Sequence, residues 1–140
     1  MLLNTYFHSL DPKGRIILPA KMREELGNHF IITKGLGERC ICIYSAEEFE
    51  ALAQRLKGVR IRQNRQIYKA LFAAAMEVDT DKQGRFLPSQ ILKDYAGINK
   101  EVAIVGQNDH AEIWDKDVWL ENDVDMSEES MLQLLDEAGL

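Results

Sequence analysis

Two short segments of the chain carry residue types suited to binding an anion. Asp11-Pro12-Lys13-Gly14-Arg15 and Asp81-Lys82-Gln83-Gly84-Arg85 place an aspartate, a glycine and an arginine at the same spacing, seventy residues apart. An aspartate can accept hydrogen bonds from the amides of a tight turn, and a glycine can adopt the positive φ that such a turn needs. Each segment is therefore predicted to form a turn that presents an arginine.

The chemistry of these side chains is that of phosphate and DNA binding. The planar guanidinium groups of Arg15 and Arg85 can each hold phosphate oxygens, or guanine O6 and N7, with two hydrogen bonds. Lys13 and Lys82 suit phosphate contacts, which position a protein on DNA without specifying a sequence. The spacing leaves an alternative open, in which each arginine pairs only with the aspartate of its own turn. The remaining motif residues are predicted to form the turns: Asp11, Gly14, Asp81 and Gly84.

The repeated aspartates also raise an enzymatic alternative, because two symmetry-related aspartates can share a proton, as in aspartic proteases. Such a pair needs a hydroxyl residue and a glycine directly after each aspartate. Here Pro12-Lys13 and Lys82-Gln83 follow instead. The nearby cations would keep both carboxylates ionised, so we expect no catalysis, no cofactor and no small-molecule substrate.

The similarity between the two halves extends beyond the turns. In each half apolar residues follow the turn, and a short helical pattern then ends at a glycine placed as a C-terminal cap, Gly27 or Gly97. A hairpin of two apolar strands comes next in each half. The chain is therefore predicted to contain two repeats, at residues 5–50 and 76–120.

The segments outside the repeats differ sharply in charge. The net charge is −6, but residues 121–140, predicted as an acidic tail with a helix after Ser127, hold seven acids and no lysine or arginine. Residues 1–120 hold seventeen basic and sixteen acidic residues. Local patches are therefore expected to decide binding, because distant charges are screened by salt.

Residues 51–75 are predicted to form a basic helical linker, with six basic residues and no acid. Two interpretations remain open: a solvated helix face that pairs with acids elsewhere, or direct contact with phosphates. The candidate secondary phosphate contacts are Arg60, Arg62 and Arg65. The tail helix, likewise, can dock on the body or bind a partner.

Cys40 and Cys42 lie in an apolar run of strand character, where residues two apart point to the same side. They are predicted to be reduced strand residues. A zinc site would need two more ligands, and His8, His29 and His110 show no ligand spacing. No metal site is predicted.

The overall composition is that of a globular protein, with 46% hydrophobic and 29% charged residues. The N-terminal residues lack the basic and apolar regions of a signal peptide, and no stretch reaches the roughly 18 apolar residues of a membrane span. We therefore expect a cytoplasmic protein with no membrane partner.

Several of these segments together resemble the MraZ family of bacterial transcriptional regulators over about residues 1–120. Both arginine turns and their order agree with the family, and the second copy departs from it in placing Pro88 one position early, with Ser89 opposite Pro19. The further segments that carry the resemblance are Tyr95-Ala96-Gly97-Ile98, residues 100–107 and Glu112-Ile113-Trp114-Asp115.

The resemblance implies a mostly β protein with short helices, of the α+β class. The expected core is an internally duplicated, AbrB- or MazE-like swapped-hairpin β-barrel with pseudo-two-fold symmetry, to which the helical linker and the acidic C-terminal helix are attached. Closing a barrel would also remove exposed strand edges. The pseudo-two-fold relation would bring both arginine turns to one face.

The resemblance also implies rings of about eight or more subunits. Because one subunit offers few phosphate contacts, we predict that such a ring binds repeated motifs in double-stranded promoter DNA. It implies repression of the protein's own promoter and of a division and cell-wall gene cluster, and hence association with the nucleoid. The alternative is an oligomeric protein-interaction scaffold without specific DNA binding.

Overall fold

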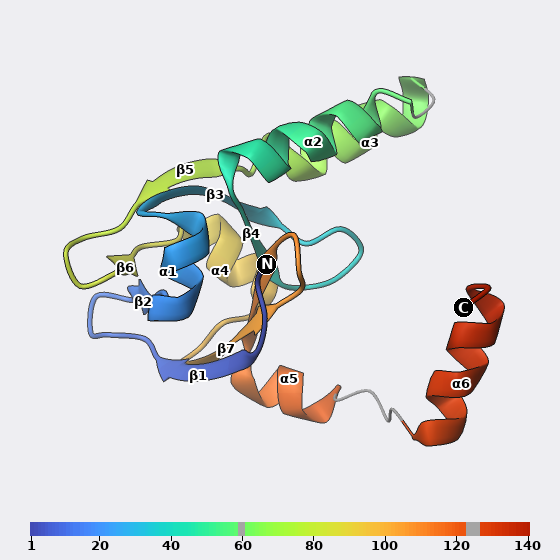
Figure 1. The fold of residues 1–140 in the computed structure, drawn as a ribbon. Helices are drawn as coiled ribbons and strands as arrows, with labels where there is room; N and C mark the ends of the chain where they lie inside the picture. The colour runs from blue at the N-terminus through green and yellow to red at the C-terminus, as the bar shows by residue number, and fades with distance from the viewer. Residues whose placement is uncertain (59–60, 123–126) are drawn as a thin grey trace.

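The computed structural model describes residues 1–58, 61–122 and 127–140, with eight strands and six helices in these ranges (Figure 1). The strands are β1 (Thr5–Ser9), β2 (Ile16–Ile17), β3 (His29–Lys34), β4 (Ile41–Tyr44), β5 (Met76–Asp79), β6 (Arg85–Phe86), β7 (Glu101–Gly106) and β8 (Ala111–Asp115). The helices are α1 (Ala20–Leu26), α2 (Ala46–Leu56), α3 (Ile61–Leu71), α4 (Gln90–Ala96), α5 (Lys116–Glu121) and α6 (Glu128–Glu137). The protein is α+β, as predicted.

The order of elements repeats along the chain. The first series runs β1, β2, α1, β3, β4, α2, and the second runs β5, β6, α4, β7, β8, α5. The helices predicted after the two turns are confirmed, and both end at glycines with positive φ, Gly27 at 74° and Gly97 at 63°. Ser45 caps α2 by accepting a hydrogen bond from the Glu48 amide at 3.1 Å.

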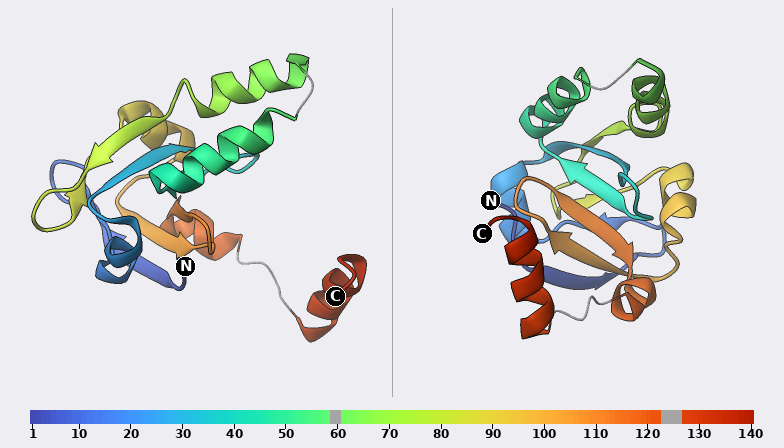
Figure 2. Two further views of the ribbon diagram at one scale, coloured as in Figure 1. Left: turned by 45° about the horizontal axis from the view of Figure 1, so that its top comes forward. Right: turned by 90° about the vertical axis from the view of Figure 1, so that its right-hand side faces the viewer.

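Strands from the two series are interleaved in one antiparallel sheet of order β1-β7-β8-β4-β3-β5 (Figures 1 and 2). β1 pairs with β7 of the second series, and β5 pairs with β3 of the first. Replacing each strand by its equivalent in the other series gives the same order, read from the opposite edge of the sheet. At its centre, Cys42 on β4 lies directly opposite Glu112 on β8, and these residues occupy equivalent places in the two series.

The expectation of a closed barrel is wrong for the described residues, because β1 and β5 are opposite edges of an open sheet. After β1 and β5 the chain turns out of the sheet, and the next strands, β2 and β6, pair with each other as a separate ribbon. Each ribbon strand has two residues, too few to join the two edges. The ribbon and helices α1 and α4 cover the open side instead.

The main core lies between the sheet, the ribbon, α1 and α4. Phe30 of β3 packs edge-to-face on Phe86 of β6, with ring centroids 5.2 Å apart, so the ribbon is fixed to the sheet by aromatic contact. Other fully buried members are Ile16, Leu18, Met22, Ile32, Ile41, Ile43, Leu92, Ile104 and Ile113.

A second cluster lies on the opposite face of the sheet, under the helical hairpin of α2 and α3 (Figure 2). This arrangement explains why all four residues of β4 are buried: they are covered on both faces. The cluster contains Cys40, Cys42, Tyr44, Leu52, Leu56 and Leu71.

The tail helix is confirmed as α6, which begins after the Ser127 cap, and none of its residues is buried. Met131, Leu132 and Leu134 stay exposed on it. None of the helices in the described ranges has the length and apolar character needed to cross a bilayer.

Candidate nucleic-acid interface

The first arginine turn is closed by its aspartate. The Asp11 carbonyl accepts a hydrogen bond from the Gly14 amide at 2.9 Å, and Asp11 Oδ1 accepts from the amides of Lys13 and Arg15 at 2.9 Å each. Gly14 has a φ of 80°, which a glycine adopts without the steric cost that other residues meet. The other carboxylate oxygen, Asp11 Oδ2, pairs with Arg15 Nε at 2.5 Å.

The second turn repeats this network. Asp81 Oδ1 accepts from the amides of Gln83 and Arg85 at 2.9 Å each, Asp81 Oδ2 pairs with Arg85 Nε at 2.8 Å, and Gly84 again has a φ of 80°. One aspartate therefore both forms the turn and orients the arginine. The pairing of each arginine with its own aspartate, expected only as an alternative, is present in both copies.

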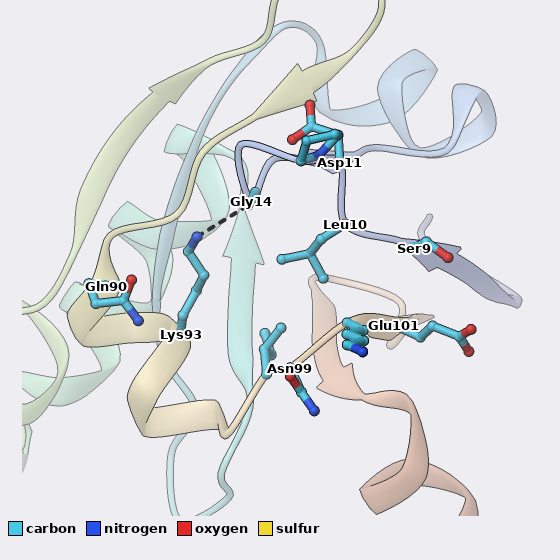
Figure 3. A pocket seen from close by; sticks show the side chains of 11 residues that line it. Ser9, Leu10, Asp11, Gly14, Gln90, Lys93, Asn99 and Glu101 are labelled. Atoms are coloured by element: carbon cyan, nitrogen blue, oxygen red, sulfur yellow. Dashed lines mark hydrogen bonds between the residues drawn. The ribbon is translucent and has the colours of Figure 1, made fainter.

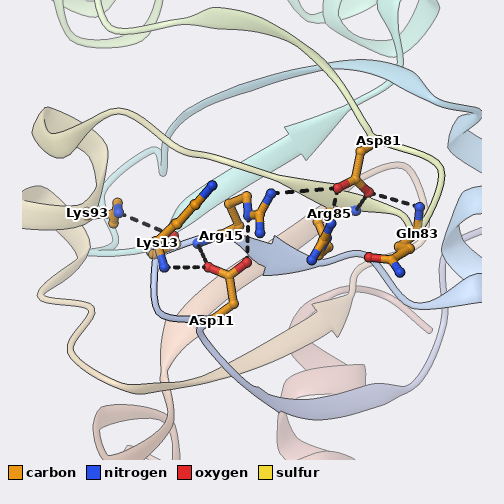
Figure 4. A network of polar contacts seen from close by, with 8 residues as sticks. Asp11, Lys13, Arg15, Asp81, Gln83, Arg85 and Lys93 are labelled. Atoms are coloured by element: carbon orange, nitrogen blue, oxygen red, sulfur yellow. Dashed lines mark hydrogen bonds and ion pairs between the residues drawn. The ribbon is translucent and has the colours of Figure 1, made fainter.

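The two turns lie next to each other across the β2–β6 ribbon (Figure 4). Arg85 is itself a ribbon residue and lies opposite Ile17, while Arg15 immediately precedes β2. Arg15 Nη1 is 3.9 Å from Asp81 Oδ2, so the first arginine also reaches the second carboxylate. The ribbon thus brings together two guanidinium groups from segments seventy residues apart.

Each arginine keeps one part of its guanidinium group available. The aspartate occupies the Nε side, so the terminal Nη groups form the edge that can meet another anion. The side chains of Arg15 and Arg85 are 26% and 29% exposed, which leaves them half-buried but reachable. Lys13 and Lys82 are exposed and form no ion pair within the described ranges.

The turn carboxylates are held in the ionised form. For Asp11, desolvation opposes ionisation, but hydrogen bonds from Arg15 and Lys13 outweigh it and lower the pKa. For Asp81, the hydrogen bond from the Arg85 amide is the largest cause of a lowered pKa. Two ionised carboxylates, each paired with a cation, are the opposite of the shared-proton pair that an aspartic protease requires.

Two further cations pack against the turns, and each comes from the other repeat. Lys93 of α4 donates to the Gly14 carbonyl at 3.2 Å, and Arg23 of α1 lies against Gly84. A β-carbon on Gly14 would be 2.4 Å from Lys93 Nζ, and one on Gly84 would be 2.6 Å from Arg23 Cζ. Glycine is therefore needed here for space as well as for backbone conformation.

The early Pro88 changes how these contacts are made. The Leu18 amide donates to the Gly84 carbonyl at 2.9 Å, but the equivalent Pro88 has no amide hydrogen to offer Gly14. The hydrogen bond from Lys93 serves that carbonyl instead. The shift also places Ser89 as the cap of α4, where its hydroxyl accepts from the Leu92 amide at 3.3 Å, while Pro19 gives α1 no side-chain cap.

Arg23 and Lys93 are the residues of this site that the sequence reasoning missed. They stand seventy residues apart, so the duplication itself was the signal that could have paired them. The sequence did not indicate that each helix packs against the turn of the other repeat. With Arg23 and Lys93, the site has six cations, of which Arg15 and Arg85 pair with the two carboxylates.

A cleft of about 580 Å³ opens beside the first turn (Figure 3). It is lined by residues around Leu10 and Asp11 on one side and by α4 and the start of β7 on the other, with Lys93 crossing it. The lining carries both Lys100 and Glu101. This mixture of charge signs gives no strong preference for an anionic small molecule.

The candidate contacts in the basic linker are less well placed. Arg65 is exposed on α3. Figure 1 shows α3 on the opposite side of the molecule from β2. Arg62 lies within α3, but its side chain is outside the described part of the structure, and Arg60 lies outside the described residues. Arg65 is thus not brought to the two turns.

Comparison with known proteins gives a consistent result along the chain. A family model described as “MraZ protein, putative antitoxin-like” matches residues 1–66 and 71–138. A protein named transcriptional regulator MraZ from Finegoldia magna is 45% identical over 121 residues, which cover 85% of this chain and 84% of that protein. Proteins of the same name from Caldicellulosiruptor bescii and Acetivibrio thermocellus are 43% and 42% identical, and both alignments cover the two chains completely.

Proposed function

The chain belongs to the MraZ family, and from that premise we propose that it is a transcriptional regulator that binds specific DNA through its two arginine turns. The observation that carries the proposal is the pairing of β2 with β6. It sets Arg15 and Arg85, each held by its own aspartate, side by side on one ribbon. A paired, pre-oriented set of arginines suits a groove of DNA, whose phosphates and bases recur at fixed intervals.

The four exposed or half-exposed cations take different roles. Arg15 and Arg85 are oriented by charge-assisted hydrogen bonds, so they lose little freedom when they bind, and we assign base contacts to them. Lys13 and Lys82 are exposed at the turn tips, and we assign phosphate contacts to them. Arg23 and Lys93 pack against the turn glycines, Gly84 and Gly14, and hold the turns in place.

The proposal includes the organisation of the chain. Residues 5–50 and 76–120 are two repeats of the AbrB-like swapped-hairpin class, residues 51–75 are a helical linker, and residues 121–140 are an acidic tail. The interleaving of β1 with β7 and of β5 with β3 supports this division. It does not depend on a closed barrel.

Affinity is the reason to propose an oligomer. The two lysines assigned to phosphates give only modest binding at physiological salt, with a slope of log K on log salt near −1.8 per subunit, at about −0.9 per phosphate. A ring of about eight or more subunits on repeated promoter motifs would raise the effective concentration of each turn pair. Such a ring would act in the nucleoid as a repressor of its own promoter and of a division and cell-wall gene cluster.

The test is fluorescence anisotropy with labelled duplex from upstream of the protein's own gene, beside a scrambled duplex, at about 0.15 M salt. The wild type is compared with the Arg15→Ala/Arg85→Ala variant, and the solution mass of each is measured. We expect preference for the native duplex, lost in a variant of unchanged mass. Equal weak binding to both duplexes, or binding that survives the double substitution, would refute the proposal and favour the protein-interaction scaffold.

A further inference from the structure

A cluster of metal-ligand side chains lies at the centre of the sheet, away from the arginine turns. Cys40 precedes β4 by one residue, Cys42 lies within β4, and His110 and Glu112 lie at equivalent places before and within β8. Cys42 and Glu112 are directly opposite each other in the β4–β8 pair. Cys40 and Cys42 in the first repeat correspond to His110 and Glu112 in the second, and the central pair of strands, β4 and β8, brings these equivalent positions together.

The donor atoms are close together. The sulfurs of Cys40 and Cys42 and a carboxylate oxygen of Glu112 all lie within 4.8 Å of one another. Zn–S bonds of about 2.3 Å in a tetrahedron place two sulfurs about 3.8 Å apart, so only small side-chain shifts are needed. His110 Nε2 is not part of this group of three but is 3.2 Å from Glu112 Oε2, so a rotation of the imidazole side chain would make it the fourth donor.

The partners of these side chains are those that orient metal ligands. His110 Nδ1 is 2.7 Å from Asp109 Oδ1 and can donate to it, and Nε2 on the other side of the ring faces Glu112. Without an ion Nε2 is protonated and donates to Glu112 Oε2, and a bound ion would take the place of that proton. Trp114 Nε1 donates to Glu112 Oε1 at 3.0 Å, so one carboxylate oxygen is fixed and the other faces His110. Tyr44 stacks on the imidazole with ring centroids 5.2 Å apart.

The four side chains lie between the buried interior and the surface. Cys40 and Cys42 are 0% and 3% exposed, in the second apolar cluster under α2 and α3. The side chains of His110 and Asp109 are 21% and 42% exposed, so the histidine side of the cluster is the side nearer to solvent. Two soft sulfur donors with one nitrogen and one oxygen donor select zinc-type ions over magnesium or calcium.

We propose that Cys40, Cys42, His110 and Glu112 form a tetrahedral binding site for zinc or a similar thiophilic divalent cation. The ion would join β4 to β8, and hence the two repeats, at the middle of the sheet. The ion binds thiolate and neutral imidazole, so any proton that these side chains carry without it is released to solvent on binding. Asp109 and Trp114 act as positioning residues.

The pairing of β4 with β8 brings together ligands that have no metal-site spacing along the chain. His110 has no ligand spacing from Cys42 along the chain, but the β4–β8 pairing removes the sequence distance. The earlier expectation of no metal ligand is therefore replaced by this proposal.

The test uses the reduced, full-length protein, freed of metal with a chelator, and titrates it with cobalt(II) alone. We expect one equivalent to produce a near-ultraviolet thiolate-to-cobalt band and the visible bands of a tetrahedral ion, and zinc(II) to abolish both. Cys42→Ser should remove the thiolate band. His29→Ala is the matched control, because it removes an exposed histidine that pairs with Asp79 of β5. His29 lies at the start of β3, before the residues that pair with β4, and Thr33 is the β3 residue opposite Cys42.

A second variant keeps the test independent of core substitutions. Asp109→Ala changes a half-exposed residue and should weaken cobalt binding by about 10- to 100-fold while leaving the shape of the spectrum unchanged. Circular dichroism checks the fold of each variant. The proposal fails if the wild type gives no thiolate band while both thiols remain titratable, or if the band survives Cys42→Ser or is lost in His29→Ala.

Discussion

Replacing both turn arginines by lysine distinguishes the contribution of their charge to DNA binding from that of the planar guanidinium group. In the structure each Arg Nε is already paired with an aspartate, at 2.5 Å in the first turn and 2.8 Å in the second. Only the terminal pair of nitrogens remains for a two-bond contact with a base. The variant Arg15→Lys/Arg85→Lys keeps the charge and removes that pair, because an ammonium group has no planar fork.

The expected effect is on specificity. A two-bond arginine–guanine contact contributes about 1–3 kcal/mol of discrimination, so each single substitution should lower the ratio of specific to non-specific affinity by about 5- to 150-fold. The slope of log K on log salt should stay near the wild-type value, because no charge is lost. The two arginines lie close together, so their effects need not add.

The matched control removes the charges assigned to phosphates. Lys13→Ala/Lys82→Ala should weaken binding to native and scrambled duplexes alike, and the slope should become shallower by about 1.8. Both variants are measured by anisotropy over a series of salt concentrations. A lysine-for-arginine variant that retains the wild-type specificity ratio, or a Lys13/Lys82 variant that loses it, would refute the division of roles.

The remaining predictions concern stability and are measured by urea unfolding. Gly84→Ala should lower the free energy of unfolding more than Gly37→Ala does. Both glycines have positive φ, which costs an alanine about 1–2 kcal/mol, but only at Gly84 would the new β-carbon meet a side chain, that of Arg23. Equal losses in the two variants would contradict the contact. Ser89→Ala should lower the free energy of unfolding by about 1 kcal/mol through loss of the α4 cap, and no loss would show that the cap is dispensable. The lowered pKa values of Asp11 and Asp81 mean that their contribution to stability is present above the ordinary value of 3.8 and is lost as pH falls through the lower, folded-state values. As the pH falls from about 5 to about 2, the range in which carboxylates titrate, the Asp11→Asn/Asp81→Asn variant should therefore lose less stability than the wild type. Parallel pH profiles of the two proteins would contradict this.

The features that could be predicted from the sequence are local. An aspartate, a glycine at positive φ and an arginine fix a turn within five residues, and the glycines that end α1 and α4 act within one helical turn. The cap at Ser127 was recognisable for the same reason. Each depends on hydrogen bonds between near neighbours in the chain.

The features that were missed depend on how distant segments pair. The crossing of Lys93 to Gly14 and of Arg23 to Gly84 needs the interleaved order of the two repeats. Barrel closure was wrongly expected because closure depends on strand length and stagger, and two-residue strands cannot bridge the sheet edges. The meeting of Cys42 with Glu112 follows from register, which one residue of slip would abolish.

The central claim is that the two turns together form the DNA-binding surface. Hydrogen–deuterium exchange of the full-length protein, followed by mass spectrometry of its peptides, tests it directly, because bound DNA must suppress the local opening of the backbone that it covers. With the native duplex, we predict slower exchange in peptides covering residues 11–18 and 81–88, and much less slowing with the scrambled duplex. Protection concentrated in α2 and α3, or equal protection by both duplexes, would contradict the account.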